Sequence, residues 1–274
     1  MSAVAAQFGS VQLGWLVVCL AITFIGIAKS GFGGGLGLIV VPITALALPY
    51  TGKYTTDDAL GLLLPLLLVG DVISVSQNWR EVRWPILRRL LPGAFVGMCF
   101  GAYLIYLLKS HAAIAAALID LEIGCESVLM VSMAWYRQLH GRQHWLMPEP
   151  ARGLITGSFA GTSTTLAHAA GPIIAMYLVP LELGRLGMIG TGQTFFMIAN
   201  ATKLPLYWQA GLFQRMSPLF ALTFCPLVIV GALCGRWLSR KMSDKVFVQV
   251  IYATTFGLGI FLIAKSAVEL LHGS

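Results

Sequence analysis

The chain has 274 residues, of which 57% are hydrophobic and only 11% are charged. A soluble globular domain carries about 25% charged residues, so this composition excludes that class and indicates a membrane protein. The formal net charge is +7, but no basic run is interleaved with aromatic residues as a nucleic-acid groove requires. The positive charge lies mostly in short loops, where it is typical of membrane topology.

Nothing in the sequence indicates a metal ion or a cofactor. The five cysteines lie in apolar segments without a C-x-x-C pair, so we expect them to be buried small hydrophobic residues. His140 and His144 stand in a polar loop without acids or cysteines beside them, and we expect both to be solvated. The N-terminal apolar block lacks a basic n-region and a cleavage site, which favours a retained span over a signal peptide.

Ten apolar blocks follow one another along the chain. They lie at about 11–28, 36–48, 59–77, 86–108, 112–135, 152–163, 168–180, 187–206, 217–238 and 247–268. Several have the length of a membrane-spanning helix, whereas three are only about a dozen residues long. The pattern predicts an all-α polytopic membrane protein.

The short blocks adjoin two unusual stretches. Residues 28–37 contain one lysine and five glycines, and residues 160–168 contain four consecutive Ser and Thr residues followed by His168. Irregular backbone at membrane depth is tolerated only where it is buried in protein or lines a water-filled cavity. We therefore expect each stretch to break its apolar run and to form a broken or re-entrant hairpin.

The two halves of the chain repeat one pattern. Adding 129, 130 or 134 to a residue number in the first half reaches a matching residue in the second, and the offset changes only across loops. Examples are Gly31 with Gly161, Pro42 with Pro172, Asp71 with Asn200, Gly97 with Gly231 and Gly101 with Gly235. We expect a first transmembrane repeat at 1–140, a polar cytoplasmic linker at 141–151 and a second repeat at 152–274, each with one interrupted hairpin and three spanning helices.

Basic residues favour the hairpin interpretation. If each break is a hairpin tip, the second repeat is inverted, and eleven basic residues collect on one side against four on the other. If each broken block crosses once, the division is nine to six. The positive-inside tendency therefore predicts two inverted-topology repeats with both termini outside. Interrupted segments at matching positions are typical of secondary transporters, whose substrate site lies at the repeat interface.

The two breaks supply candidate ligands for an anion. An ammonium group, glycine amides, hydroxyls and an imidazole can all donate to an oxyanion. The alternatives are a snorkelling lysine, packing glycines and hydroxyls that bond within their own helix. The candidate substrate-binding residues are Lys29, Ser30, Gly31, Gly33, Gly34, Gly35, Thr162, Ser163, Thr164, Thr165, His168, Gly171 and Lys203.

Asp71 and Asn200 are the polar repeat mates in the middle of apolar spans. An intramembrane aspartate is costly unless it is paired, protonated or facing water. Asp71, Asn200 and His168 are therefore candidates for structural support or for carrying a coupling proton. Lys203 lies close to Asn200 on the same helix face, and it could pair with Asp71 or face the anion. We expect Lys29→Ala to abolish anion transport and to leave the protein folded.

Taken together, these residues resemble the TauE/SafE sulfite exporter family, also called the 4-toluene sulfonate uptake permeases. The resemblance rests on the stretch 29–35 with Pro42, on Gly171-Pro172 and on Gly70-Asp71, and it covers about residues 13 to 265. It implies a secondary transporter of the bacterial inner membrane, coupled to protons, for sulfite, sulfoacetate or another organosulfonate. We expect this transporter to work by alternating access. Its partners would be the bilayer, the small anion and protons.

The residues 162–165 and His168 depart from the glycine-rich stretch that many members of the family have before Gly171-Pro172. This departure leaves the identity of the anion open. A passive anion channel remains an alternative. An intramembrane hydrolase with Ser163 and His168 is disfavoured because the chain has no G-x-S-x-G motif and no partner acid, so we expect no enzymatic activity.

Overall fold

The computed structural model describes residues 2–32, 40–55, 58–107, 149–168 and 170–272, with short pieces between 121 and 136. All regular structure in these residues is helical. Four helices in the described residues are long and apolar enough to cross a membrane, at Val11–Phe32, Asp58–Glu81, Trp84–Leu107 and Lys245–Val268. The prediction of an all-helical polytopic membrane protein is confirmed.

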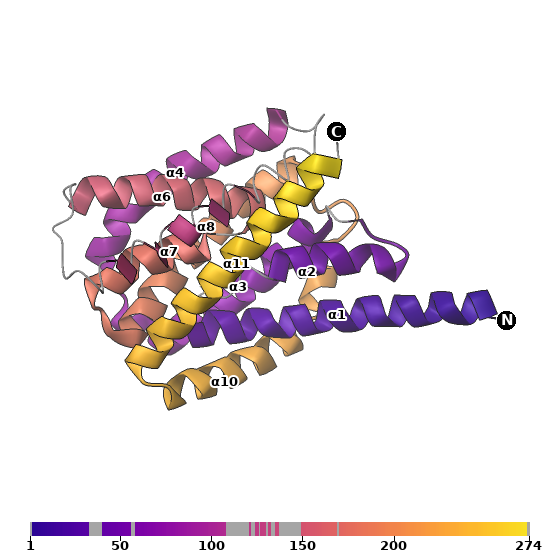
Figure 1. Ribbon diagram of the computed structural model, residues 1–274, viewed down its shortest axis with the longest axis horizontal. Coiled ribbons are helices and arrows are strands. Elements are labelled where there is room, and N and C mark those ends of the chain that lie inside the picture. Colours follow the sequence, from indigo (N-terminus) through magenta and orange to yellow (C-terminus); the bar gives the residue numbers. More distant parts are fainter. Residues whose placement is uncertain are drawn as a thin grey trace.

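The described helices occur in a similar order in both halves of the chain (Figure 1). The first half contains α1 (Ser2–Phe32), α2 (Val40–Ala47), the 3-10 turn η2 (Leu48–Thr51), α3 (Asp58–Asn78), η3 (Trp79–Glu81) and α4 (Trp84–Leu107). The second half contains α6 (Glu149–Ala167), α7 (Gly171–Leu178), η5 (Val179–Leu181), α8 (Gly184–Gln209), α9 (Pro218–Leu222), α10 (Cys225–Lys241) and α11 (Asp244–His272).

The short helices α2 and α7 each double back along the long helix that precedes them. Gly14 of α1 packs against Tyr50, at the far end of the α2–η2 segment, so closely that a Cβ at Gly14 would lie 3.1 Å from the backbone of Tyr50. Gly153 of α6 lies in the same way beside the hydroxyl of Tyr177, at the far end of α7. Each long helix and its short successor therefore run antiparallel (Figure 1).

The four hydroxyl residues 162–165 do not interrupt their helix, and this part of the prediction is wrong. Helix α6 continues through them to Ala167. The Thr165 hydroxyl donates to the carbonyl of Gly161 at 2.9 Å, and such bonds satisfy a hydroxyl inside a helix. The chain leaves the helix at His168, whose φ is 53°. This left-handed conformation is uncommon for a residue with a side chain.

The first break also begins later than the sequence indicates. Lys29, Ser30 and Gly31 are helical, because α1 extends to Phe32. The amides of these three residues therefore belong to a helix and do not form a glycine turn. The glycines at 33, 34 and 35 lie outside the described residues, so the prediction that they form a hairpin tip stays a prediction.

Glycines bring two pairs of long helices into backbone contact, α4 with α6 and α1 with α10. A Cβ at Gly97 would lie 2.0 Å from the carbonyl oxygen of Ser158, and a Cβ at Gly231 would lie 2.0 Å from that of Thr23. Small residues commonly allow this close approach between membrane helices, where apolar burial alone gives little attraction.

Gly97→Ala is expected to lower the free energy of unfolding by about 1–3 kcal/mol, the usual cost of overpacking. The added methyl group would force α4 away from the backbone of α6. Gly257 of α11 is the matched control, because a Cβ there meets nothing within 4 Å. Thermal unfolding of the detergent-purified variants checks this, and an equal loss for Gly97→Ala and Gly257→Ala would contradict the packing argument.

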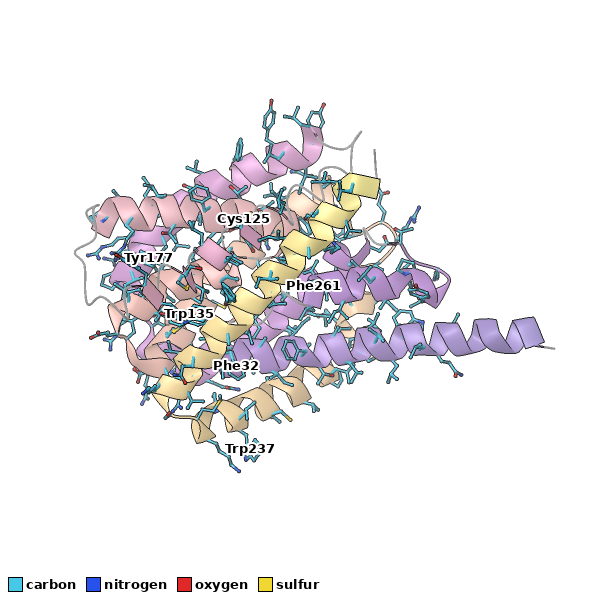
Figure 2. All side chains as sticks on the ribbon, viewed as in Figure 1. Phe32, Cys125, Trp135, Tyr177, Trp237 and Phe261 are labelled. Carbon is cyan, nitrogen blue, oxygen red and sulfur yellow. The ribbon has the colours of Figure 1, made fainter. Side chains whose placement is uncertain are left out.

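Many large apolar side chains of the described residues are exposed on the outside of the bundle, as expected of a surface in contact with lipid. Exposed side chains include Leu16 and Leu20 of α1, Val96 and Phe100 of α4, and Trp237 of α10, and Figure 2 shows Trp237 projecting away from the bundle. The polar side chains of the membrane-spanning helices are concentrated inside, around α3 and α8, which pack against each other.

Candidate functional site

One face of α8 carries the side chains around which the candidate site is built. Phe196, Asn200, Lys203 and Tyr207 follow one another at intervals of three or four residues, so the helical period places them on one side. All four are buried, with relative exposures of 5%, 2%, 0% and 1% respectively. This face of α8 packs toward α3, α6 and α1.

The first polar cluster joins α1, α3 and α8 through a single carboxylate. Lys29 Nζ donates to Asp71 Oδ1 at 2.5 Å, and Asn200 Nδ2 donates to Asp71 Oδ2 at 2.6 Å. Asp71 is fully buried and Lys29 is 5% exposed. The ammonium group of Lys29 also lies 4.9 Å from the ring centre of Phe196. Lys29 therefore does not snorkel to an interface, because its charge is held at the buried Asp71.

The second polar cluster joins α8 to the end of α6. Lys203 Nζ donates to the carbonyl oxygen of Thr164 at 2.8 Å and lies 3.0 Å from its hydroxyl. The same ammonium group is 2.7 Å from His168 Nδ1. The hydroxyl of Tyr207 donates to the carbonyl oxygen of Thr165 at 2.9 Å and lies 3.5 Å from His168 Nε2. Lys203 thus satisfies the carbonyl end of α6, where helices leave acceptors unpaired.

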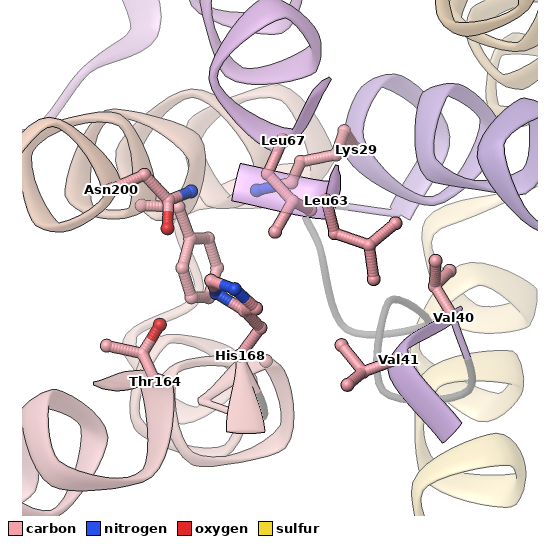
Figure 3. A pocket seen from close by; sticks show the side chains of 10 residues that line it. Lys29, Val40, Val41, Leu63, Leu67, Thr164, His168 and Asn200 are labelled. Atoms are coloured by element: carbon pink, nitrogen blue, oxygen red, sulfur yellow. The ribbon is translucent and has the colours of Figure 1, made fainter. Parts of the chain in front are cut away.

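A small cavity of about 20 Å³ lies between the two clusters (Figure 3). Its polar lining comes from Lys29, Thr164, His168 and Asn200, and its apolar lining includes Leu63 and Leu67 of α3. A cavity of this size has room for about one water molecule, so it must widen before it admits an oxyanion.

The cavity also meets the beginnings of both short helices. Val40 opens α2 and Gly171 opens α7, and both line the cavity. The first amides of a helix have no partner within that helix, and its N-terminal end carries a partial positive charge. Two such ends therefore meet at a cavity that is lined by the ammonium group of Lys29 and that lies next to the bonding partners of Lys203.

Lysines outnumber carboxylates in this buried region. The described residues around the cavity include two lysines, Lys29 and Lys203, and one carboxylate, Asp71. The other buried carboxylate in the described residues is Asp58, which begins α3 and accepts hydrogen bonds from Thr55. It lies 13 residues before Asp71, or about 20 Å along the helix.

The structure brings together only part of the predicted substrate site. Lys29, Thr164, His168, Gly171 and Asn200 line the cavity, and Asp71 and Lys203 bond directly to members of its lining. The remaining described candidates do not line it, and they are Ser30, Gly31, Thr162, Ser163 and Thr165.

Local contacts explain two of these exclusions. Thr162 Oγ1 lies within 3.1 Å of the carbonyls of Ser158 and Gly97, so it faces α4. Gly31 packs against the backbone of Gly235 on α10. Both residues therefore contribute to helix packing.

The sequence interpretation missed Phe196, Ser74 and Tyr207. Ser74 Oγ donates to the carbonyl oxygen of Lys29 at 3.1 Å, and Tyr207 supports the end of α6 as described above. The available signal was the stripe on α8, because Phe196 and Tyr207 continue the spacing of Asn200 and Lys203 in both directions. Trp208, next to Tyr207, is 70% exposed, as expected of an anchor at the membrane interface.

Ser163 and His168 do not form the nucleophile and base pair of a serine hydrolase in the structure. The Ser163 hydroxyl is buried without a hydrogen-bond partner in the described part of the chain. The two ring nitrogens of His168 face Lys203 and Tyr207 instead. A serine nucleophile needs a base within hydrogen-bonding distance.

Comparison with known proteins gives one match. The model of the family described as "Sulfite exporter TauE/SafE" matches residues 18–262. No curated protein and no solved structure matches the chain. Because the family model covers nearly the whole chain, including every described residue around the cavity, the chain belongs to the TauE/SafE sulfite exporter family of membrane transporters.

Proposed function

We propose that this protein is a secondary carrier that moves a small sulfur-containing anion, such as sulfite, sulfoacetate or another organosulfonate, by alternating access. The anion would bind at the cavity between Lys29 and Lys203. The observation that carries the proposal is the presence of two buried lysines and a single buried carboxylate around that cavity. Membership of the sulfite exporter family supports the same class of substrate.

The second lysine, Lys203, has no carboxylate among its hydrogen-bond partners. Asp71 balances Lys29, and the partners of Lys203 are a carbonyl, a hydroxyl and an imidazole, which are all uncharged when the imidazole is neutral. A buried charge without a counter-charge costs several kcal/mol. An anion in the cavity would supply that counter-charge, and the ends of α2 and α7 would add their partial positive charge.

Matching contacts in the two halves support the proposal of two inverted repeats at 1–140 and 152–274. Gly231 packs on the Thr23 carbonyl as Gly97 packs on the Ser158 carbonyl. The two glycines, on α4 and α10, are 134 residues apart in the sequence, and the two carbonyl residues, on α1 and α6, are 135 residues apart. These contacts favour an offset of 135 for α1 and α6, which pairs Gly161 with Gly26 and replaces the offset of 130 inferred from the sequence.

The same offset relates the two polar clusters. It pairs Lys29 with Thr164, while the offset of 129 for α3 and α8 pairs Ser74 with Lys203. Ser74 donates to the carbonyl of Lys29, and Lys203 donates to the carbonyl of Thr164. Each half thus has one lysine and one hydroxyl residue at these two positions. The lysine is on the first long helix (α1) in the first half, and on the later helix (α8) in the second half. The mates Asp71 and Asn200 bond to each other between the halves.

In this proposal the protein lies in a bacterial-type inner membrane with both termini outside and the linker 141–151 in the cytoplasm. The excess of basic residues on one side supports the orientation. The two hairpins α1–α2 and α6–α7 would enter from opposite sides, so that their turns meet the cavity near the middle of the membrane.

Thermal unfolding of the purified protein with sulfite, sulfate, thiosulfate and organosulfonates tests the proposal. An anion that binds the site at 100 times its dissociation constant stabilises the folded protein by about 2.7 kcal/mol. Lys203→Met is expected to remove this stabilisation without lowering the melting temperature of the ligand-free protein, because it removes a buried uncompensated charge. Lys245→Met, at an exposed lysine, is the control and should respond like wild type. A response in Lys203→Met equal to that of wild type would contradict the proposed site.

A further inference from the structure

The protonation state of His168 determines the net charge at the cavity. This residue lines the cavity at the end of α6 and has a φ of 53°. Its Nδ1 lies 2.7 Å from Lys203 Nζ, so one hydrogen atom occupies the line between these two nitrogens. An ammonium group only donates. With Lys203 charged, Nδ1 therefore accepts and the imidazole is neutral.

The other ring nitrogen faces Tyr207. The hydroxyl hydrogen of Tyr207 is directed at the carbonyl oxygen of Thr165, 2.9 Å away. The tyrosine oxygen lies 3.5 Å from His168 Nε2 and is left to accept from it, and the backbone of Leu60 on α3 is a further hydrogen-bond acceptor for the ring. This arrangement places the hydrogen of the neutral imidazole on Nε2 and leaves Nδ1 to Lys203. The Lys203–His168 pair consequently holds one positive charge, and a second proton on His168 would break the bond between the two side chains.

The remaining charged groups that face this pair are few in the described residues. They are Lys29 from α1 and Asp71 from α3, which form a salt bridge, and α6 contributes the uncharged Thr164. Residues 33–39, which follow α1 in the sequence, are all glycine, leucine or isoleucine and carry no ionisable side chain. With Lys203 charged, these described groups therefore carry one net positive charge when His168 is neutral and two when His168 is protonated.

Resting on the proposed function, we propose that the charge of the anion decides whether a proton binds with it. A monoanion, such as a sulfonate or hydrogensulfite, neutralises the site with His168 neutral and takes up no proton. A dianion, such as sulfate or the fully ionised form of sulfite, binds together with one proton on His168 Nδ1. That new N–H leaves Lys203 and donates to an oxygen of the dianion in the cavity.

The consequence is a rule for coupling. The loaded site is electrically neutral with either kind of anion. The protein therefore undergoes its conformational change with the same net charge at the site whichever anion is bound. A dianion moves with one proton and a monoanion moves with none. Discrimination between the two therefore depends on pH and on His168, and it needs no change in the other residues that line the cavity.

The test uses two anions whose charge is constant between pH 6 and pH 8, methanesulfonate as the monoanion and sulfate as the dianion. Dissociation constants of the purified full chain are measured by calorimetry across this range. The dissociation constant of methanesulfonate is expected to stay constant. The dissociation constant of sulfate is expected to rise about tenfold for each pH unit above the pKa that His168 has in the anion-free protein, because one proton is taken up with the anion.

Histidine NMR of the ¹⁵N-labelled protein assigns the proton. At pH 8, sulfate is expected to convert one neutral imidazole to imidazolium, and methanesulfonate is expected to convert none. The responding signal should be absent from the spectrum of His168→Asn, because this variant has no imidazole at position 168. Asparagine is chosen because it tolerates the left-handed backbone at this position. This assignment does not require the variant to bind either anion.

The outcomes separate this inference from the proposed function. If neither anion binds at any pH, the anion site itself is wrong. If both bind with the same pH dependence, or if sulfate protonates a histidine other than His168, the site stands and the charge rule is overturned. A tenfold slope for sulfate alone, with the signal lost in His168→Asn, supports the rule.

Discussion

Lys29→Met is expected to abolish anion binding and to lower the free energy of unfolding by about 3–5 kcal/mol, the usual cost of removing one partner of a buried ion pair. Asp71 is fully buried, and Lys29 is its charged hydrogen-bond partner. Asn200 alone would then contact an uncompensated carboxylate. Thermal unfolding in detergent measures the loss of stability.

The double variant Lys29→Met with Asp71→Asn separates the two effects. It removes both charges together, so its stability is expected to return to within about 1–2 kcal/mol of wild type, since replacing a whole buried pair is often close to neutral. Anion binding is expected to remain lost, because the ammonium group beside the cavity is gone. A double variant as unstable as Lys29→Met alone would contradict the pairing with Asp71.

Moving the second lysine from α8 to α6 is expected to restore binding that its removal abolishes. Lys203→Ser alone should weaken anion binding at least 100-fold, a loss of about 2.7 kcal/mol. Adding Thr164→Lys would give the second half the arrangement of the first, where Lys29 and Ser74 occupy the corresponding positions. The new ammonium group would meet Asn200 as Lys29 meets Asp71, and the amide oxygen of Asn200 can accept from it.

The expected recovery in the Thr164→Lys, Lys203→Ser variant is at least tenfold in the dissociation constant. Calorimetric titration with the anion selected by thermal unfolding measures it. Thr165→Lys with Lys203→Ser is the matched control, because Thr165 bonds back to Gly161 and does not line the cavity, and it should not recover binding. Equal binding by the two double variants, both folded, would contradict the relation between the halves.

Much of the site could be predicted from the sequence because ionisable residues are rare inside a membrane. Lys29, Asp71 and Lys203 stood out on this ground alone, and the structure brings all three to one region. Their partners could not be predicted. Lys203 could have paired with Asp71 or faced an anion, and its contacts with Thr164 and His168 depend on how α6 approaches α8.

The extent of the second break was mispredicted for a local reason. A run of hydroxyl residues favours helix ends and turns when it stands alone, yet each hydroxyl can also bond to the carbonyl four residues before it. Thr165 does so, and α6 continues to Ala167. Glycines match at several spacings, so the sequence alone does not choose between repeat offsets. The packing of Gly26 on α10 and of Gly161 on α4 favours 135 over 130, as do the contacts of Gly97 and Gly231.

The pair of Asp71 with Lys29 also changes one expectation from the sequence. Lys29→Ala was expected to leave the protein folded, whereas the salt bridge predicts a less stable protein. Loss of transport in that variant alone would therefore not identify an anion ligand. A variant that removes both charges is needed to separate binding from folding.

Sulfite flux into proteoliposomes tests the central claim most directly. Vesicles containing the wild-type chain are compared with vesicles containing Lys29→Met, Asp71→Asn and with protein-free vesicles, after thermal unfolding has shown that the double variant is folded. We predict saturable sulfite flux for the wild type and flux at the protein-free level for the double variant. Wild-type flux no greater than that of empty vesicles, or equal flux through the folded double variant, would contradict a sulfur-anion carrier that uses this site.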